Sequence, residues 1–354
     1  MGDLPPRYDG TLQPEVWVQD LRFFCALRGI HDQATVLNIA ILRVDPIIPI
    51  PNDIDITSFN SLINVLKDHA THSVFRADSL EKLKNLKYER NRVMSEFIAK
   101  FISLCNSADI TDLREKKDYL LRNMPDDIVR NVLGSRIENL NSFGEVIDTF
   151  KDVILEHKRL IRFGSKIALK HVVTGRFLSS KGINYETGSK QQMVFCSGWQ
   201  PDKQYDFWIV IPPNKQYRQS GSLVPFNSII GLKHQQTGRN LHSHGGQESP
   251  KTRQQEVTCY GGALEWNGHD GPPNEEDNWI LQRYSKTSIY DNSGYWAVGD
   301  TISLRHDHAH AKKSLMSHDF ILNNGYQEVT CHADGHEENH KWVVIKNLKE
   351  LVEN

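Results

Sequence analysis

The sequence has few cysteines, and their placement excludes a disulfide-rich or zinc-ribbon architecture. Its 354 residues include five cysteines, and none of them form a CxxC pair. A disulfide framework needs an even set at close spacing, and a structural zinc site usually takes close cysteine pairs. We therefore expect free thiols in a reducing compartment at Cys25, Cys105, Cys196, Cys259 and Cys331.

Long apolar runs and targeting signals are also missing. No stretch approaches the roughly 20 apolar residues that a membrane-spanning helix needs. Residues 1–6 contain no basic segment followed by an apolar run, so no secretory signal is expected, and residues 350–354 are not an ER-retention signal. We expect a cytoplasmic protein that does not span a membrane.

Neither a charge excess nor a catalytic fingerprint is present. Lys+Arg number 42 against Asp+Glu 44, and neither half is basic, so nucleic acid is not expected as a partner. No nucleotide-binding loop, Rossmann fingerprint or Ser-His-Asp order occurs. We expect a protein without catalytic residues or cofactors. A hydrolase using Glu275, Glu276 or Asp277 is the alternative, and it requires a cleft at that segment.

Up to about residue 160, the apolar residues recur at helical spacing. Trp17, Leu21 and Phe24 lie at i, i+4 and i+7. Ser142 and Glu145 have the spacing of a capping box. The pattern predicts an all-α domain over residues 1–160.

After Gly164 the helical period disappears, and three similar segments follow one another. Three blocks recur in each segment: 164–171 with 227–234 and 299–306, 191–196 with 254–259 and 326–331, and 206–210 with 277–281 and 339–344. The apolar residues alternate within the first block, as they do in strands. Three such copies can close around an axis and bury the face that one copy leaves open. We predict an all-β domain over residues 161–354, a β-trefoil with repeats at about 164–213, 227–285 and 299–348, which we call the first, middle and third copies.

Two residue types recur once in each copy. The histidines can contact a ligand or hydrogen-bond a turn, and their recurrence favours the structural role. The tryptophans are expected in the shared core. The repeated residues are His171, His234, His306, Trp208, Trp279 and Trp342.

The blocks carry a family resemblance. The middle copy has Leu232-Lys233-His234, Thr237-Gly238-Arg239 and Leu241-His242-Ser243-His244. Residues 164–348 resemble the MIR domain shared by protein O-mannosyltransferases, inositol trisphosphate and ryanodine receptors and stromal cell-derived factor 2-like proteins. The first copy has Ser179-Ser180-Lys181 in place of His-Ser-His, and the third has only Leu315-Met316-Ser317-His318. The resemblance implies a binding module whose site is best preserved in the middle copy.

The turn residues of that copy are the candidate ligand-binding residues. Arg and Lys can bind phosphate or carboxylate, and His with nearby aromatic rings such as Tyr260 and Trp266 can accept a sugar or peptide. We therefore expect a carbohydrate, a phosphorylated small molecule or a peptide as partner. The candidates are Lys233, Arg239, His242 and His244, with Lys170 and Arg176 as their first-copy counterparts.

No metal site is expected from the sequence. His306, His308 and His310 alternate as they would on one face of a strand. However, His306 is the third copy's version of the repeated histidine, and no HExxH motif accompanies it.

The N-terminal half resembles another family. Residues 5–158 contain Tyr8-Asp9-Gly10, then Leu83-Lys84-Asn85-Leu86 and finally Tyr119-Leu120-Leu121-Arg122-Asn123-Met124-Pro125, an order similar to the capsid-like Gag segment of gypsy-class retrotransposons. A zinc knuckle is missing. The resemblance implies an assembly domain, and we expect weak homo-oligomers through an apolar helix face formed by Val146, Ile147, Phe150 and Ile154.

The sequence thus predicts a cytoplasmic, non-catalytic interaction protein with a helical assembly or adaptor domain and a MIR-like trefoil. The alternative is a regulatory or accessory factor in protein O-mannosylation or ER quality control, which needs a luminal address.

Overall fold

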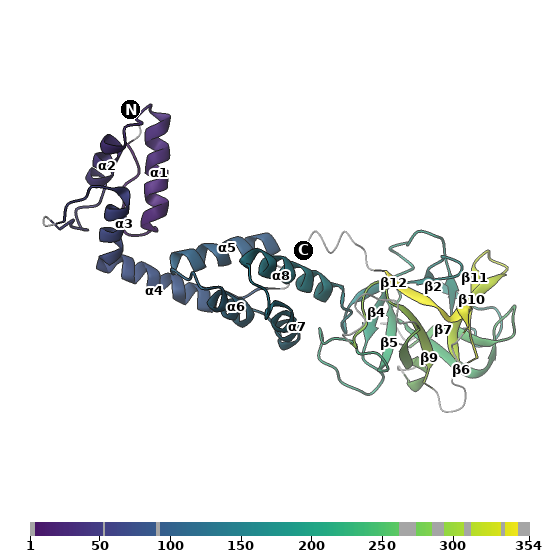
Figure 1. Cartoon of the computed structure of the whole chain (residues 1–354). Coiled ribbons are helices and arrows are strands. Elements are labelled where there is room, and N and C mark those ends of the chain that lie inside the picture. The colour runs from purple at the N-terminus through teal and green to yellow at the C-terminus, as the bar shows by residue number, and fades with distance from the viewer. Residues whose placement is uncertain are drawn as a thin grey trace. The chain divides into compact units, whose positions relative to one another are not determined.

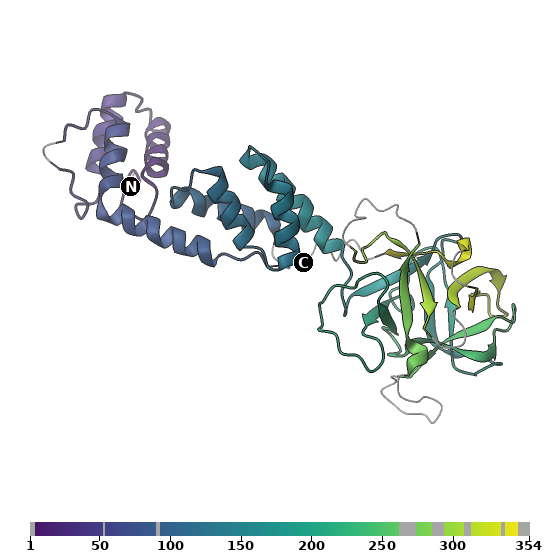
Figure 2. The same cartoon turned by 60° about the horizontal axis from the view of Figure 1, so that its bottom comes forward.

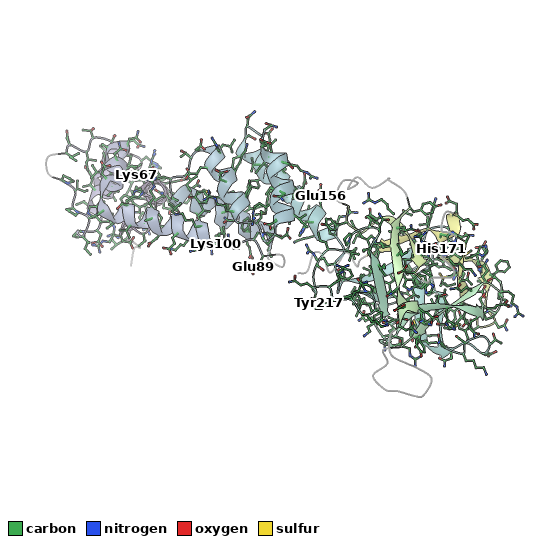
Figure 3. All side chains as sticks on the ribbon, turned by 90° about the horizontal axis from the view of Figure 1, so that it is seen from below. Lys67, Glu89, Lys100, Glu156, His171 and Tyr217 are labelled. Carbon is green, nitrogen blue, oxygen red and sulfur yellow. The ribbon has the colours of Figure 1, made fainter. Side chains whose placement is uncertain are left out.

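The chain divides into a helical unit and a strand unit. A computed structural model describes residues 4–51, 54–89, 93–261, 274–284, 294–307, 313–333 and 337–345. The boundary between the two compact units lies between Leu155 and Glu156. Helices form the first unit and strands the second (Figure 1, Figure 2). Figure 3 adds the side chains, with Lys67 labelled in the helical unit and His171 in the strand unit.

Several helices of the described residues begin where a side chain binds the first free backbone N–H groups. Asp112 Oδ1 accepts a hydrogen bond from Glu115 N at 2.9 Å. Ser142 and Glu145 form the reciprocal capping bonds that their spacing predicts, at 3.2 and 3.3 Å. The helices are α1 (Pro14–Leu27), α2 (Gln33–Leu42), α3 (Phe59–Asp68), α4 (Ala70–Asn85), α5 (Met94–Ser107), α6 (Leu113–Arg122), α7 (Asp127–Ile137) and α8 (Phe143–Arg159).

The apolar stripe expected to drive self-association lies inside the helical unit's own core. Val146, Phe150 and Ile154 are buried in one cluster with residues of α5, α6 and α7. Ile147 is also buried. The prediction that this face is open to a second chain was wrong, because α8 has to cover the apolar faces of its neighbours.

The strands found in the described residues belong to the second unit, and each copy contributes four of them. Short 3-10 helices, η1 (Glu275–Asp277) and η2 (Glu338–His340), precede the last strands of the middle and third copies. The strands are β1 (Lys166–His171), β2 (Leu178–Asn184), β3 (Gln192–Cys196), β4 (Trp208–Ile211), β5 (Ile229–His234), β6 (Asn240–Glu248), β7 (Gln255–Tyr260), β8 (Trp279–Arg283), β9 (Thr301–His306), β10 (Ser314–Ile321), β11 (Gln327–His332) and β12 (Trp342–Ile345).

Antiparallel pairing closes six of these strands into a ring. Following the pairs from β1 leads through β4, β5, β8, β9 and β12 and back to β1. The others form the hairpins β2–β3, β6–β7 and β10–β11. Their second strands, β3, β7 and β11, pair with one another. Ring closure satisfies backbone groups that an open sheet would leave at its edges.

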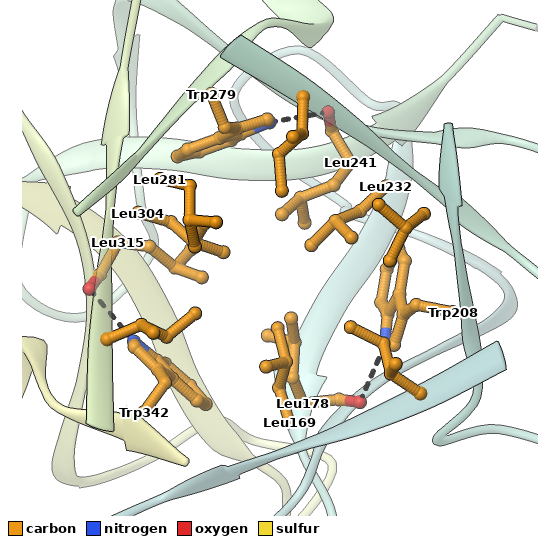
Figure 4. Close-up of a cluster of buried hydrophobic side chains, with 14 of the residues drawn as sticks. Leu169, Leu178, Trp208, Leu232, Leu241, Trp279, Leu281, Leu304, Leu315 and Trp342 are labelled. Carbon is orange, nitrogen blue, oxygen red and sulfur yellow. Dashed lines mark hydrogen bonds between the residues drawn. The ribbon is translucent and has the colours of Figure 1, made fainter. Parts of the chain in front are cut away.

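The repeated tryptophans lie in the core that the ring encloses. Trp208, Trp279 and Trp342 are fully buried, and each indole N–H donates to a leucine carbonyl of its own copy. Figure 4 shows the three indoles around the central leucines, with these hydrogen bonds dashed. Burying a Trp together with its N–H requires such a partner.

The repeated histidines join neighbouring copies. His234 Nε2–H donates to the carbonyl of Tyr205 in the first copy at 2.9 Å, and its ring centroid lies 5.0 Å from that of Trp208. His171 and His306 make the same kind of bond to Asn339 and Glu276, both at 2.9 Å. Each acceptor lies three residues before a repeated tryptophan, so each copy is tied to the one before it around the ring.

The helices of the described residues are too short or too polar to cross a bilayer.

Candidate functional site

The middle copy holds a buried histidine that a carboxylate orients. His242 lies on β6, and its Nδ1–H donates to Oδ1 of Asp277 at 2.8 Å. Both side chains are almost completely buried. Oδ2 of Asp277 accepts bonds from Asn240 Nδ2 and from the backbone N–H of Asn274, both at 3.1 Å. Because Nδ1 of a neutral His242 carries the proton, its Nε2 presents a lone pair.

A second histidine and a second carboxylate lie beside that lone pair. Nδ1 of His244 is 3.1 Å from His242 Nε2, and Oε2 of Glu276 is 3.6 Å from it. The Tyr260 ring covers His242, with centroids 4.9 Å apart. The pKa of the His244 imidazole is lowered from its ordinary value. Burial is the largest cause, and the charge of the nearby His242 is the second.

The described residues of the other copies do not form this cluster. In the first copy, Ser179 replaces His242 and donates a short hydrogen bond to Asp206, the equivalent of Asp277. In the third copy, Met316 takes the position of His242, and His340 takes that of Asp277. Among the described residues, the combination of two histidines with Glu276 and Asp277 therefore belongs to the middle copy.

A hollow of about 300 Å³ lies next to Asp277. Its lining combines Ile211 and the residues that follow β4 with Gly231, Lys233, Asn240 and Asp277. Within the described part of the chain, Asn214 Nδ2 and Asn240 Oδ1 are buried without a hydrogen-bond partner. The backbone N–H of Asn214 is held by Asn278 Oδ1 at 2.8 Å.

The charges around the hollow are close to balanced. Lys215 Nζ lies 3.3 Å from Glu275 Oε1, and Lys233 shares the lining with Asp277. Glu275 and Lys215 are exposed, so their attraction is weak. The hollow therefore has no surplus of positive charge for an anion.

A comparison with known families matches this part of the chain. The family model of the MIR domain covers residues 183–344. The C-terminal half contains a MIR domain. The sequence resemblance to that family is thereby confirmed.

Curated relatives share the MIR domain region. The chain is 31% identical over 150 residues to a stromal cell-derived factor 2-like protein of Dictyostelium discoideum, covering 41% of this chain and 63% of that protein. It is 29% identical over 199 residues to dolichyl-phosphate-mannose–protein mannosyltransferase 1 of Candida albicans, covering 54% of this chain and 22% of that protein. The chain thus spans less than two thirds of either relative.

A solved structure is similar as well. The crystal structure of the SDF2-like protein from Arabidopsis thaliana is 26% identical, with a TM-score of 0.46, and the similarity covers 53% of this chain and 95% of that one.

The MIR domain brings three of the six candidate ligand residues to one region. Lys233 lines the hollow together with Asp277, and Asp277 in turn binds His242, which lies beside His244. Arg239 is directed elsewhere, since its Nη1 donates to Gln192 Oε1 of the first copy at 3.1 Å.

The first-copy candidates belong to a separate surface. Arg176 donates to the carbonyl of Ser197 at 2.9 Å, and its guanidinium lies 4.5 Å from the centre of the Trp199 ring. Lys170 is on β1 of the same copy. These two residues do not join the middle-copy site.

The remaining residues named from the sequence either lie outside the described residues or have other contacts. His308, His310 and Trp266 lie outside the described residues. Of the carboxylates weighed for a hydrolase, Glu275 is exposed, whereas Asp277 caps η1 and holds His242.

Sequence reasoning missed the parts of the site that surround the motif. Asn240 directly precedes Leu241-His242 and could have been included on that ground. Asn214 lies between the first two copies in a segment without a motif, and only the fold brings it to Lys233.

Proposed function

We propose that the C-terminal half is a non-catalytic binding module that holds a small hydroxylated ligand, such as a carbohydrate, in the hollow beside Lys233. The observation that carries this proposal is the pair of buried polar atoms on Asn214 and Asn240 that lack partners among the described residues. One is a donor and the other an acceptor. Both residues line the hollow, and leaving a buried polar group unsatisfied costs about 1–3 kcal/mol.

The balanced charge favours a sugar over a phosphorylated ligand. Phosphate sites usually gather several cations or backbone N–H groups. Here Lys215 is near Glu275, and Lys233 is near Asp277 in the lining. The volume of about 300 Å³ suits a small ligand at the lower end of ordinary binding pockets.

A β-trefoil of three internal repeats is the framework that we propose for this module. The closed six-strand ring, the three paired hairpins and the His-to-carbonyl links between copies support it. In such a fold, one copy can keep a site while the other two diverge.

Binding of the full chain to a glycan and phosphoinositide array, followed by calorimetry with free mannose, tests the proposal. We expect glycan binding, and Lys233→Ala or Asn214→Ala should weaken it about two- to tenfold, as expected for one lost hydrogen bond. Lys170→Ala, at the same position in the first copy, is the matched control. Binding only to phosphorylated ligands, or equal loss in the control, would contradict the proposal.

For the whole chain, we propose a cytoplasmic interaction protein in which the helical unit is a Gag-like assembly or adaptor domain. Its support is the sequence resemblance of that half. The similarity to a protein mannosyltransferase favours a second candidate, an accessory role in O-mannosylation or ER quality control. Fractionation of cells that express the natural gene distinguishes the two candidates. Protein found in the ER lumen would support only the accessory role in O-mannosylation or ER quality control.

A further inference from the structure

We infer that His242, His244 and Glu276 form a binding site for a divalent transition-metal ion of the Zn²⁺ class. This site is distinct from the proposed sugar pocket, because none of the three side chains lines the hollow. Their ligand atoms lie within 4.8 Å of one another. The two imidazoles and one carboxylate are a ligand set that zinc sites use with a fourth position open.

The distances suit one ion held by all three groups. His242 Nε2 is 3.1 Å from His244 Nδ1 and 3.6 Å from Glu276 Oε2. Two ligands at about 2.0–2.2 Å from one ion are separated by roughly 3–4 Å. The ion would replace the proton that the two rings share, so only small side-chain movements are required.

The surroundings of His242 are those of an oriented metal ligand. Asp277 accepts the Nδ1 proton of His242, which directs the Nε2 lone pair toward His244 and Glu276. Asn240 and the backbone N–H of Asn274 hold Asp277 in turn. Metal-bound histidines commonly donate their other N–H to a carboxylate, which fixes the ring and strengthens the ligand.

The elements that carry the ligands explain how an ion would affect the domain. His242 and His244 are two residues apart on β6, where β6 pairs with β7 and begins to bend at the register shift after Ser243. Glu276 lies on η1, three residues before Trp279, the first residue of β8. A shared ion would link the β6–β7 hairpin to the ring, and binding to the folded state alone would stabilise it.

The third copy provides a matched comparison within the chain. His318 occupies the position of His244, and it lies 3.4 Å from the carboxylate of Glu328. The position of His242 is taken by Met316, which has no imidazole. Glu328 corresponds to Glu256 of the middle copy, and Asn339 stands at the position of Glu276, so the third copy keeps one of the three ligand positions.

The experiment is a titration of the tag-free full chain, stripped with a chelator, with ZnCl₂ by calorimetry. We expect one Zn²⁺ per chain, with affinity at least tenfold lower in His244→Gln and in Glu276→Gln. His318→Gln is the control and should bind as the parent does. Co²⁺ should produce a visible absorption band that His244→Gln loses, and circular dichroism checks that each variant is folded.

If the parent chain and all of these variants bound Zn²⁺ with equal affinity, the ion would be bound by other histidines. That result would overturn the proposed site. Absence of Zn²⁺ binding to the parent chain would overturn it as well. Lys233→Ala should leave Zn²⁺ binding unchanged, so failure of the sugar pocket and failure of the metal site are distinguished.

Discussion

At the scale of single residues, the core cysteines illustrate what burial does to reactivity. Cys196, Cys259 and Cys331 are fully buried at the same position of the three copies, and burial raises the pKa of each thiol to about 12. The thiolate is the reactive form of cysteine. These thiols therefore act as small apolar side chains.

We predict that the native chain resists thiol reagents at neutral pH. All five cysteines are buried and free. A pKa of about 12 instead of 9 lowers the thiolate fraction roughly a thousandfold, in addition to steric protection. When the chain is titrated with a chromogenic disulfide reagent, the cysteine thiols should be labelled only after denaturant is added. Rapid labelling of the core cysteines in the native chain would contradict this.

Trp279 should be among the most costly residues to truncate. Its indole is fully buried, and its N–H donates to Leu241 O at 2.9 Å. We expect Trp279→Ala to lower the free energy of unfolding by about 3–5 kcal/mol, which approaches the whole stability of many domains. Denaturant titration measures this. Trp199→Ala is the control, because that ring is 64% exposed, and an equal loss there would refute the assignment.

At the scale of elements, the links between copies make the strand unit sensitive to acid. His171 on β1 and His234 on β5 are buried, and desolvation lowers the pKa of both below its ordinary value. In each, Nε2–H donates to a carbonyl of the neighbouring copy, and Nδ1 lies 2.9 Å from a threonine hydroxyl. The neutral ring satisfies both bonds.

The sign of the pH effect follows from this pKa direction. A histidine with a depressed folded-state pKa contributes its full stability above the unfolded value of about 6.5, and that contribution is lost as the pH falls below it. We expect the unfolding midpoint of the strand unit to fall as the pH drops below about 6.5. In His234→Gln the pH slope should shrink, while replacing the exposed His332 should leave it unchanged. A slope that persists in His234→Gln would exclude this residue as a source.

A sequence pattern predicted an element correctly when the groups that it relates lie close together in the chain. Ser142 and Glu145 cap α8 as their spacing requires, since both groups are fixed by one helical turn. The apolar stripe on α8 was predicted to pair with a second chain, but it packs in the core of its own unit. Helical spacing shows that a face is apolar, but it does not show which surface covers that face.

At the scale of the whole molecule, the helical unit still offers a surface for association, but on another helix. Val16, Phe23 and Leu27 share one face of α1 and are 48%, 67% and 72% exposed. Apolar side chains grouped in this way often cover one another in symmetric pairs.

We predict weak, concentration-dependent self-association of the full chain through this face of α1. Sedimentation equilibrium should show a rising average mass, and Phe23→Glu should abolish the rise. Phe320→Glu, which replaces an exposed phenylalanine of the strand unit, serves as control. A monomeric mass at the highest soluble concentration would remove the assembly role.

The repeated blocks of the sequence predicted by themselves that the C-terminal half is built from similar β segments and that its middle copy keeps the most complete motif. Such features are local in sequence, because alternation and repetition are visible along the chain. The site depended on contacts between distant segments: Asp277 reaches His242 across 35 residues, and Asn214 reaches the hollow through Asn278, 64 residues away. Only ring closure brings these groups together, since strand pairing, rather than residue spacing, determines which loops meet.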